Sequence, residues 1–285
     1  MKKLLVCLDG SLYGQSCCQY ALWLSQKTEA VVDTLYVSEL WQFEAPLVAD
    51  FGGSLGAQPY MGLTAQLQKI EQDKAGVMKE FVEKAFADAG MAGHVNFHHR
   101  TGVLVDALEE FEKTDPAPEL LIIGKRGEGA NMAKAHLGSN MERVVRATSL
   151  PCLIANREFF EPKKLLLAYD GSSSADKAVA WYASRPAALA HTELHVVTVA
   201  KRGEEDKASE QLRKAEETLT KASLHPVCQM LAGIPADAIA AYQQSQDINF
   251  LLMGAYGHSR IRRLLIGSTT TELLQRCRIP TILFR

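Results

Sequence analysis

The feature that most constrains the fold of this chain is an internal repeat. The string KLLVCLDGS at residues 3–11 returns as KLLLAYDGS at residues 164–172, so each half opens with an apolar run that ends in Asp-Gly-Ser. Later apolar runs, amphipathic segments and glycine-rich loops also follow in the same order in both halves. Self-similarity of this extent indicates two copies of one domain within the 285 residues.

The apolar runs predict parallel β-strands. They are apolar throughout and alternate with helical patterns, as expected for strands that helices cover on both faces. We therefore predict an α/β protein with two tandem, doubly wound, five-stranded parallel sheets, for which right-handed crossovers favour the strand order 3-2-1-4-5. The predicted domains cover residues 1–156 and 163–285, and Asn, Glu and Pro in residues 156–162 mark the linker between them.

A glycine-rich loop follows the fourth predicted strand of the second half. It runs from Gly254 through Gly257 to Gly267 with the pattern G-x2-G-x9-G-S/T, and Ser268 and Thr269 begin the last helix. Glycines let the backbone approach a phosphate, and a helix N-terminus attracts an anion. The other interpretation is that the glycines only turn the chain and that Ser268 only caps the helix.

Asp170 ends the first predicted strand of the same half. With the order 3-2-1-4-5, the strand order reverses between strands 1 and 4, and ligands of open α/β sheets bind at that point. A carboxylate repels phosphates unless a cation intervenes, so Asp170 suits ribose or base contacts, or a Mg²⁺ ion. It also suits the N-cap of the first helix.

The complete set of motifs resembles the universal stress protein (UspA-like) family over nearly all of both halves. The residues that carry the resemblance in the second half are Asp170-Gly171-Ser172, Gly233-Ile234-Pro235 and the G-x2-G-x9-G-S/T loop. The resemblance implies a Rossmann-like fold of the adenine nucleotide alpha hydrolase type and a site for ATP or AMP. The residues implied for that site are Ala168, Asp170, Val199, Met253, Gly254, Gly257, His258, Gly267, Ser268 and Thr269.

The first half carries the loop in altered form. Ten residues, and not nine, separate Gly127 from Gly138, and the proline of the Gly233-Ile234-Pro235 element is missing from Gly102-Val103-Leu104. We expect the extra residue to shift the start of the last helix away from the first glycines, which makes this half a mainly structural copy. If it binds a ligand, the weaker site consists of Asp9, Val37, Gly124, Gly127, Gly138 and Ser139.

The first half also carries an insertion at residues 41–64 that mixes aromatic residues with Gly and Pro. A loop of this length without regular structure is usually functional or disordered, so it is a candidate lid or docking arm for a protein partner. A charged amphipathic helix is predicted to follow at about 67–89. Its predicted core-facing stripe is Leu67, Ile70, Lys74, Val77, Phe81 and Phe86.

Composition limits the other classes of function. The basic residues are scattered and aromatic content is 7%, which argues against a nucleic-acid surface. The apolar run before Asp9 is too short for a signal peptide and no run approaches a membrane span, so we expect a cytoplasmic protein that has no membrane partner.

The six cysteines form no C-x-x-C pair and suit reduced structural thiols, with the adjacent Cys17 and Cys18 as a candidate redox pair. His98 and His99 lack further ligands at metal spacing, so no metal site is predicted.

Charge favours the second half for anion binding. Residues 1–160 carry 15 basic and 20 acidic side chains, whereas residues 161–285 carry 16 and 13.

Because the loop holds no evident general base, we predict a stress-response regulator that binds nucleotide with little or no hydrolysis and has no catalytic residue. The alternatives are a nucleotide-independent scaffold built as an internal pseudo-dimer, with further homodimerisation left open, and a nucleotidyl or phosphoryl transferase. The resemblance implies that residues 151–155 and 280–284 pair to form that pseudo-dimer.

Overall fold

The computed structural model describes residues 1–39, 58–127, 137–185, 191–255 and 266–285. The described strands are β1 (Lys3–Leu8), β2 (Val31–Ser38), β3 (Val95–Thr101), β4 (Leu120–Gly124), β5 (Cys152–Ala155), β6 (Lys164–Ala168), β7 (Glu193–Ala200), β8 (Val227–Ala232), β9 (Phe250–Gly254) and β10 (Thr281–Phe284). The described helices are α1 (Leu12–Thr28), α3 (Gln58–Asp88), α4 (Leu104–Glu112), α5 (Ser139–Ala147), α6 (Ser173–Ala183), α7 (Glu205–Lys221), α8 (Pro235–Ser245) and α9 (Ser268–Arg276), with a short 3₁₀ turn at Ala92–His94.

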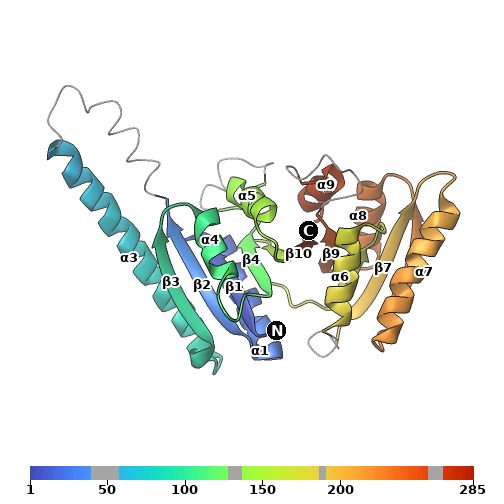
Figure 1. Ribbon diagram of the computed structural model, residues 1–285, viewed down its shortest axis with the longest axis horizontal. Coiled ribbons are helices and arrows are strands. Elements are labelled where there is room, and N and C mark those ends of the chain that lie inside the picture. Colours follow the sequence, from blue (N-terminus) through green and yellow to red (C-terminus); the bar gives the residue numbers. More distant parts are fainter. Residues whose placement is uncertain (40–57, 128–136, 186–190, 256–265) are drawn as a thin grey trace.

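The strands form one continuous sheet of ten strands in the order β3-β2-β1-β4-β5-β10-β9-β6-β7-β8 (Figure 1). Within each half all pairings are parallel and the order is 3-2-1-4-5, which confirms the prediction. The two halves join through β5 and β10, which pair antiparallel with Leu153 opposite Ile282. The predicted pairing of the final strands is therefore confirmed.

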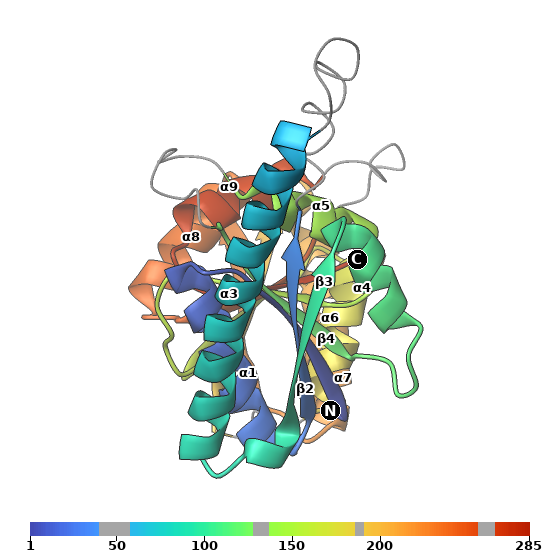
Figure 2. The same cartoon turned by 90° about the vertical axis from the view of Figure 1, so that its left-hand side faces the viewer.

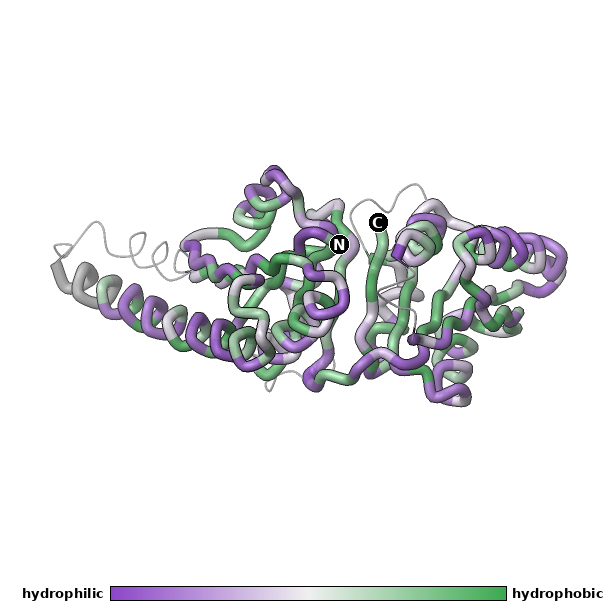
Figure 3. The backbone as a smooth tube through the Cα atoms, turned by 90° about the horizontal axis from the view of Figure 1, so that it is seen from below, coloured by the Kyte–Doolittle hydropathy of each residue, from purple (hydrophilic) through white to green (hydrophobic). Residues whose placement is uncertain are grey.

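Side chains on the two faces of the sheet enter two separate cores. In β1, Leu4 and Val6 belong to one core, whereas Leu5 and Cys7 belong to the other, because successive side chains of a strand point to opposite faces. Helices α1, α3, α6 and α7 cover the first core, and α4, α5, α8 and α9 cover the second. This double cover explains the continuous apolar runs, which appear in Figure 3 as hydrophobic central strands.

The long helix α3 lies along the outer edge of the first half (Figure 2). It begins at Gln58, so the last part of the predicted insertion is helical, while most of that insertion lies outside the described residues. The predicted core-facing stripe is wrong at four positions, since Ile70, Val77 and Phe81 are 50%, 68% and 42% exposed and Lys74 is exposed too.

The face of α3 that packs on the sheet is offset from the predicted stripe. It is built from Ala75, Val82 and Phe86, which are all buried. The offset arises because the helix sits over the sheet edge, where one flank of an apolar stripe contacts the core and the other flank faces solvent.

Contacts outside the sheet also join the two halves. The side chain of Arg185, at the end of α6, bonds Glu119 of the first half with 2.6 Å between Nη2 and Oε2. The hydroxyl of Tyr20 on α1 accepts a hydrogen bond from the backbone amide of Phe160 at 3.2 Å, and the Tyr20 ring lies edge-on to Phe159. These contacts fix the connecting segment against the first half.

Candidate nucleotide site

A cavity of about 260 Å³ opens at the carboxyl ends of β6 and β9, the two strands between which the order of the second half reverses. Its walls come from the ends of β6, β7 and β9 and from helices α7, α8 and α9. The lining residues are Ala168, Tyr169, Asp170, Val197, Val199, Lys201, Glu204, Lys207, Ala208, Gln211, Pro235, Ile239, Met253, Gly254, Gly267, Ser268, Thr269, Thr270 and Leu273. The cavity therefore lies where open α/β sheets bind ligands.

Eight of the ten residues expected at this site line the cavity. Three of them, Ala168, Val199 and Met253, give it an apolar floor that suits a flat aromatic ring. The other two, Gly257 and His258, lie outside the described residues.

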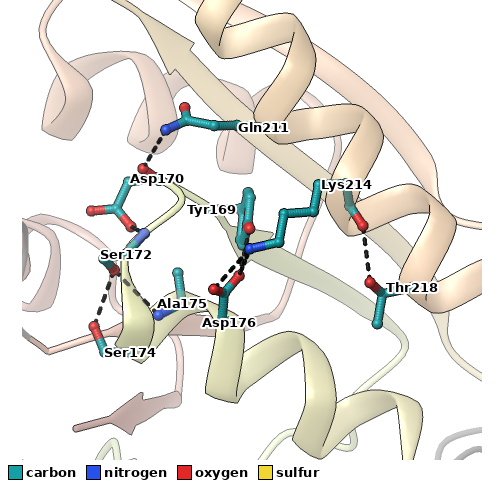
Figure 4. A network of polar contacts seen from close by, with 9 residues as sticks. All are labelled: Tyr169, Asp170, Ser172, Ser174, Ala175, Asp176, Gln211, Lys214 and Thr218. Carbon is teal, nitrogen blue, oxygen red and sulfur yellow. Dashed lines mark hydrogen bonds and ion pairs between the residues drawn. The ribbon is translucent and has the colours of Figure 1, made fainter.

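Asp170 lies at the exposed rim, where its carboxylate shapes the turn after β6 (Figure 4). Its Oδ1 accepts a hydrogen bond from the backbone amide of Ser172 at 2.9 Å, and its carbonyl accepts one from Gln211 of α7 at 2.9 Å. The N-cap of α6 is Ser172, whose hydroxyl accepts from the amide of Ala175. The interpretation of Asp170 as the N-cap is therefore wrong, although it supports the residue that caps.

A polar network beside Asp170 holds α6 against α7 (Figure 4). Lys214 of α7 bonds both carboxylate oxygens of Asp176, at 3.0 and 2.9 Å, and the hydroxyl of Tyr169 donates to the same carboxylate. Burial, and then the Asp176 carboxylate, raise the pKa of Tyr169 to about 12, so this hydroxyl keeps its proton. The network gives the rim of the cavity a fixed position.

Helix α9 begins at the cavity without a side-chain cap. The N-cap is Gly267, which has no side chain to accept a hydrogen bond, so Ser268 does not cap the helix as the alternative interpretation required. The amide of Thr271 donates to the Gly267 carbonyl at 2.9 Å, which leaves the three preceding amides at the helix start. Uncapped amides and the helix dipole favour an anion there.

Packing accounts for the glycine at position 254 but not for the one at 267. A Cβ at Gly254 would lie 2.4 Å from the hydroxyl oxygen of Ser174, so the close approach of α6 requires glycine. Among the described residues, the nearest atom to a Cβ at Gly267 would be the Ala255 carbonyl oxygen at 3.4 Å, an ordinary contact, and φ is −58°. The fold would accept another residue at position 267.

Several lining residues were missed by sequence reasoning. Lys201 and Lys207 bring positive charge to the cavity, and Gln211 comes from the same helix as Lys207. Lys201 could have been inferred because it follows the end of β7, the strand next to β6. The residues on α7 could not, since helical periodicity does not reveal which turn passes a strand end.

The first-half candidates also gather at the strand ends, and the first glycine is crowded there as Gly254 is in the second half. A Cβ at Gly124 would lie 2.8 Å from Cβ of Tyr13, and one at Gly127 would lie 2.8 Å from the Asp9 carboxylate. The carboxylate of Asp9 accepts hydrogen bonds from the backbone and hydroxyl of Ser11. Val37 is the penultimate residue of β2, beside β1, Gly138 is the N-cap of α5 and Ser139 is its first residue.

The expected shift of the last helix in the first half is not found. The amide of Gly138 donates to the carbonyl of Lys125 at 3.0 Å, as the amide of Gly267 donates to Ala255 at 3.1 Å. Both helix starts are thus anchored on the residue after the first glycine. The additional residue falls within 128–136, outside the described residues.

The other residues singled out in the sequence, two histidines and two cysteines, are hydrogen-bonded or buried within the fold. His98 bonds Asp33 and His99 bonds Ser38. Burial raises the pKa of the Cys18 thiol to about 12 and that of Cys17 well above its usual value, which argues against a redox role for the pair. Within the described ranges no group of three His, Cys, Asp or Glu side chains could hold a metal ion.

The sheet and its cavity define a duplicated, doubly wound α/β protein with a ligand-sized pocket at the switch point of its second half. The sequence profile of the Universal stress protein family matches residues 1–156 and again residues 161–285. The chain is 38% identical over 291 residues to Universal stress protein Slr1230 of Synechocystis sp., with all of both chains covered. The protein therefore belongs to the universal stress protein family.

Solved structures agree on the fold. A universal stress protein from Archaeoglobus fulgidus is similar with a TM-score of 0.72 at 20% identity, over 99% of this chain and 98% of that one. A putative universal stress protein from Pseudomonas aeruginosa is similar with a TM-score of 0.63 at 16% identity, over 100% and 93% of the two chains. None of the helices within the described ranges has both the length and the hydrophobicity that a membrane span requires.

Proposed function

We propose that the second half binds ATP or AMP and that the protein is a stress-response regulator with little or no hydrolysis. Family membership supports a role of this kind. The apolar floor of Ala168, Val199 and Met253 suits adenine, and Asp170 at the rim suits ribose hydroxyls or Mg²⁺. The start of α9 suits the phosphates, with Lys201 and Lys207 adding positive charge.

Gly267 is the observation that carries this proposal. Its backbone conformation and surroundings would accept a side chain, yet the residue is glycine at a helix start that opens into the cavity. A ligand that lies against the backbone accounts for the missing side chain, because a Cβ would stand between a phosphate and the helix amides.

The groups that line the described part of the cavity support the proposal of binding with little turnover. Those residues include no histidine, and the carboxylate of Glu204 is 3.5 Å from the ammonium group of Lys207. An ATPase assay with Mg²⁺ is expected to show at most slow turnover. Repeated turnovers that Asp170→Asn removes would assign a transferase or hydrolase instead.

Mass spectrometry of the small molecules released from the purified protein tests the proposal. We expect ATP or AMP at up to one equivalent per chain. The continuous sheet through β5 and β10 favours the scaffold as the second candidate. A protein that carries no nucleotide and takes up none when ATP is added would support that scaffold and overturn the proposal.

A further inference from the structure

A second and larger cavity, of about 740 Å³, lies where the two halves of the chain meet. The first half contributes residues after β4 and β5, and the second half contributes the end of α9 and the turn that follows it. The lining residues are Tyr13, Lys125, Arg126, Leu137, Asn156, Arg157, Glu158, Phe160, Gln275 and Arg278. None of them lines the nucleotide cavity, and the joined sheet is needed to bring them together.

Positive charge dominates this junction cavity. Its described lining holds four cationic side chains, those of Lys125, Arg126, Arg157 and Arg278, against the single carboxylate of Glu158. Like charges gathered in one hollow repel one another, and walls of low dielectric strengthen that repulsion. A bound anion would relieve it.

Lys125 is the most enclosed of these cations. Its ammonium group is 3.4 Å from the carbonyl oxygen of Cys277, in the second half. Burial, and to a smaller extent the charges of Arg126 and Arg278, lower the pKa of Lys125 to about 8. The fold thus places a lysine where its charge is costly and where two arginines increase that cost.

Asn156 adds a hydrogen-bond donor in need of an acceptor. Its side-chain nitrogen is buried and has no hydrogen-bond partner among the described residues. A buried amide without a partner is destabilising, and a ligand oxygen would satisfy it. Aromatic surface is present too, since Tyr13 and Phe160 line the same cavity.

The junction cavity does not repeat the nucleotide site, because its cationic pair occurs only in the first half. In the aligned repeats Lys125 corresponds to Ala255 and Arg126 to Tyr256, so the cationic pair has no counterpart in the second loop. The repeat therefore gives no structural reason for placing two cations directly after the first glycine.

We propose that the junction cavity binds a phosphorylated small molecule. Its phosphoryl group would be held by Lys125, Arg126 and Arg278, and its organic part would lie against Tyr13 and Phe160. Arginine forks and an ammonium group match phosphate oxygens, and the amide of Asn156 provides a further donor. Because both halves contribute, the bound ligand stabilises the joint between them.

Pyrophosphate titrated into the full chain by calorimetry tests this proposal. The titration uses a Ser268→Asp background, in which an added carboxylate at the start of α9 keeps phosphates out of the nucleotide cavity. Arg278→Gln is expected to weaken pyrophosphate binding about tenfold or more, since it removes a charge-assisted contact. The matched control is Arg276→Gln, which alters an exposed residue of the same helix end that is paired with Asp237 and does not line the cavity.

Equal affinities in the two variants, or the absence of saturable pyrophosphate binding, would overturn the proposal. A second measurement needs no variant within the cavity: amine acylation at pH 8 followed by peptide mass spectrometry. Pyrophosphate should protect Lys125 several-fold and leave the exposed Lys113 unchanged, whereas equal labelling would count against the site. Competition with ribose 5-phosphate and AMP distinguishes a sugar phosphate from a nucleotide, and neither result depends on whether the second half binds ATP.

Discussion

Single residues distinguish the part of the glycine loop that packing requires from the part that we propose to meet a ligand. Gly254 is crowded by Ser174 of α6, whereas Gly267 has room for a side chain. The two substitutions to alanine should therefore differ. Gly254→Ala should destabilise the protein by about 1 to 3 kcal/mol through overpacking, and Gly267→Ala should change stability by less than about 0.5 kcal/mol.

Urea unfolding of both variants, without added nucleotide, measures this difference. Ser174→Gly combined with Gly254→Ala is the control, because it removes the atom that the new methyl group would strike. The assignment of a structural role to Gly254 fails if Gly254→Ala is neutral, or if the double variant recovers no stability.

The adjacent thiols of Cys17 and Cys18 are buried at 0% and 1% exposure. Because burial raises the pKa of both, they remain protonated at pH 8 and should react with a thiol reagent only after unfolding. Burial raises the pKa of Cys228 only to about 11 and this thiol is half-buried, so it should react before Cys17 and Cys18 in the native protein. Cys228→Ser should remove that native reaction. Rapid native labelling of Cys17 or Cys18 would contradict this account.

Helix α3 carries one buried and one exposed phenylalanine, and their substitution should affect stability to different extents. Phe86 is fully buried in the first core, and Phe81 is 42% exposed on the same helix. Phe86→Ala should cost about 3 to 5 kcal/mol, whereas Phe81→Ala should cost less than about 1 kcal/mol.

Chemical denaturation of the two variants tests the orientation of α3. The substitutions remove the same atoms from the same helix, so each is the control for the other. Similar losses of stability at Phe81 and Phe86 would show that α3 packs with the predicted stripe toward the sheet.

The strand order could be predicted because its determinants are local. Continuous apolar runs, glycine turns and right-handed crossovers decide the order within each half. The family resemblance predicted the apolar floor of the second-half cavity, where Ala168 and Met253 lie opposite each other near the ends of adjacent strands. The face of α3 could not, because a stripe of apolar residues does not reveal which flank meets a sheet edge.

The start of the last helix in the first half could not be predicted either. Residue counting suggested a shift, but the hydrogen bond from Gly138 to Lys125 anchors the helix independently of the loop length. The junction cavity could not be predicted either. It forms where the end of α9 lies beside the residues after β5, and the sequence of one half does not specify this contact with the other half.

At the scale of the whole molecule, an ion pair reinforces the joint between the halves. Burial tends to raise the pKa of Glu119, but hydrogen bonds from the Lys2 amide and from Arg185 outweigh it and hold that pKa below its usual range. The stability gained from Glu119 is therefore fully present above the unfolded pKa of about 4.3 and is lost as pH falls through the lower folded value.

Comparison of Glu119→Gln with the unaltered protein over pH 3 to 7 measures this contribution. The difference in unfolding free energy should be about 1 kcal/mol or less near pH 7, because the carboxylate is partly exposed, and should vanish under acid. A difference that grows as pH falls would reverse the assigned sign.

We propose one intact nucleotide site, in the second half of a duplicated fold. Calorimetric titration with ATP of two matched variants tests this proposal. Ser139 and Ser268 are exposed first residues of equivalent helices, where an aspartate favours the helix dipole but repels phosphate. We predict one ATP per chain at the second-half site, binding weakened about tenfold or more by Ser268→Asp, and no change with Ser139→Asp. ATP affinity that survives Ser268→Asp, or is lost with Ser139→Asp, would contradict the account.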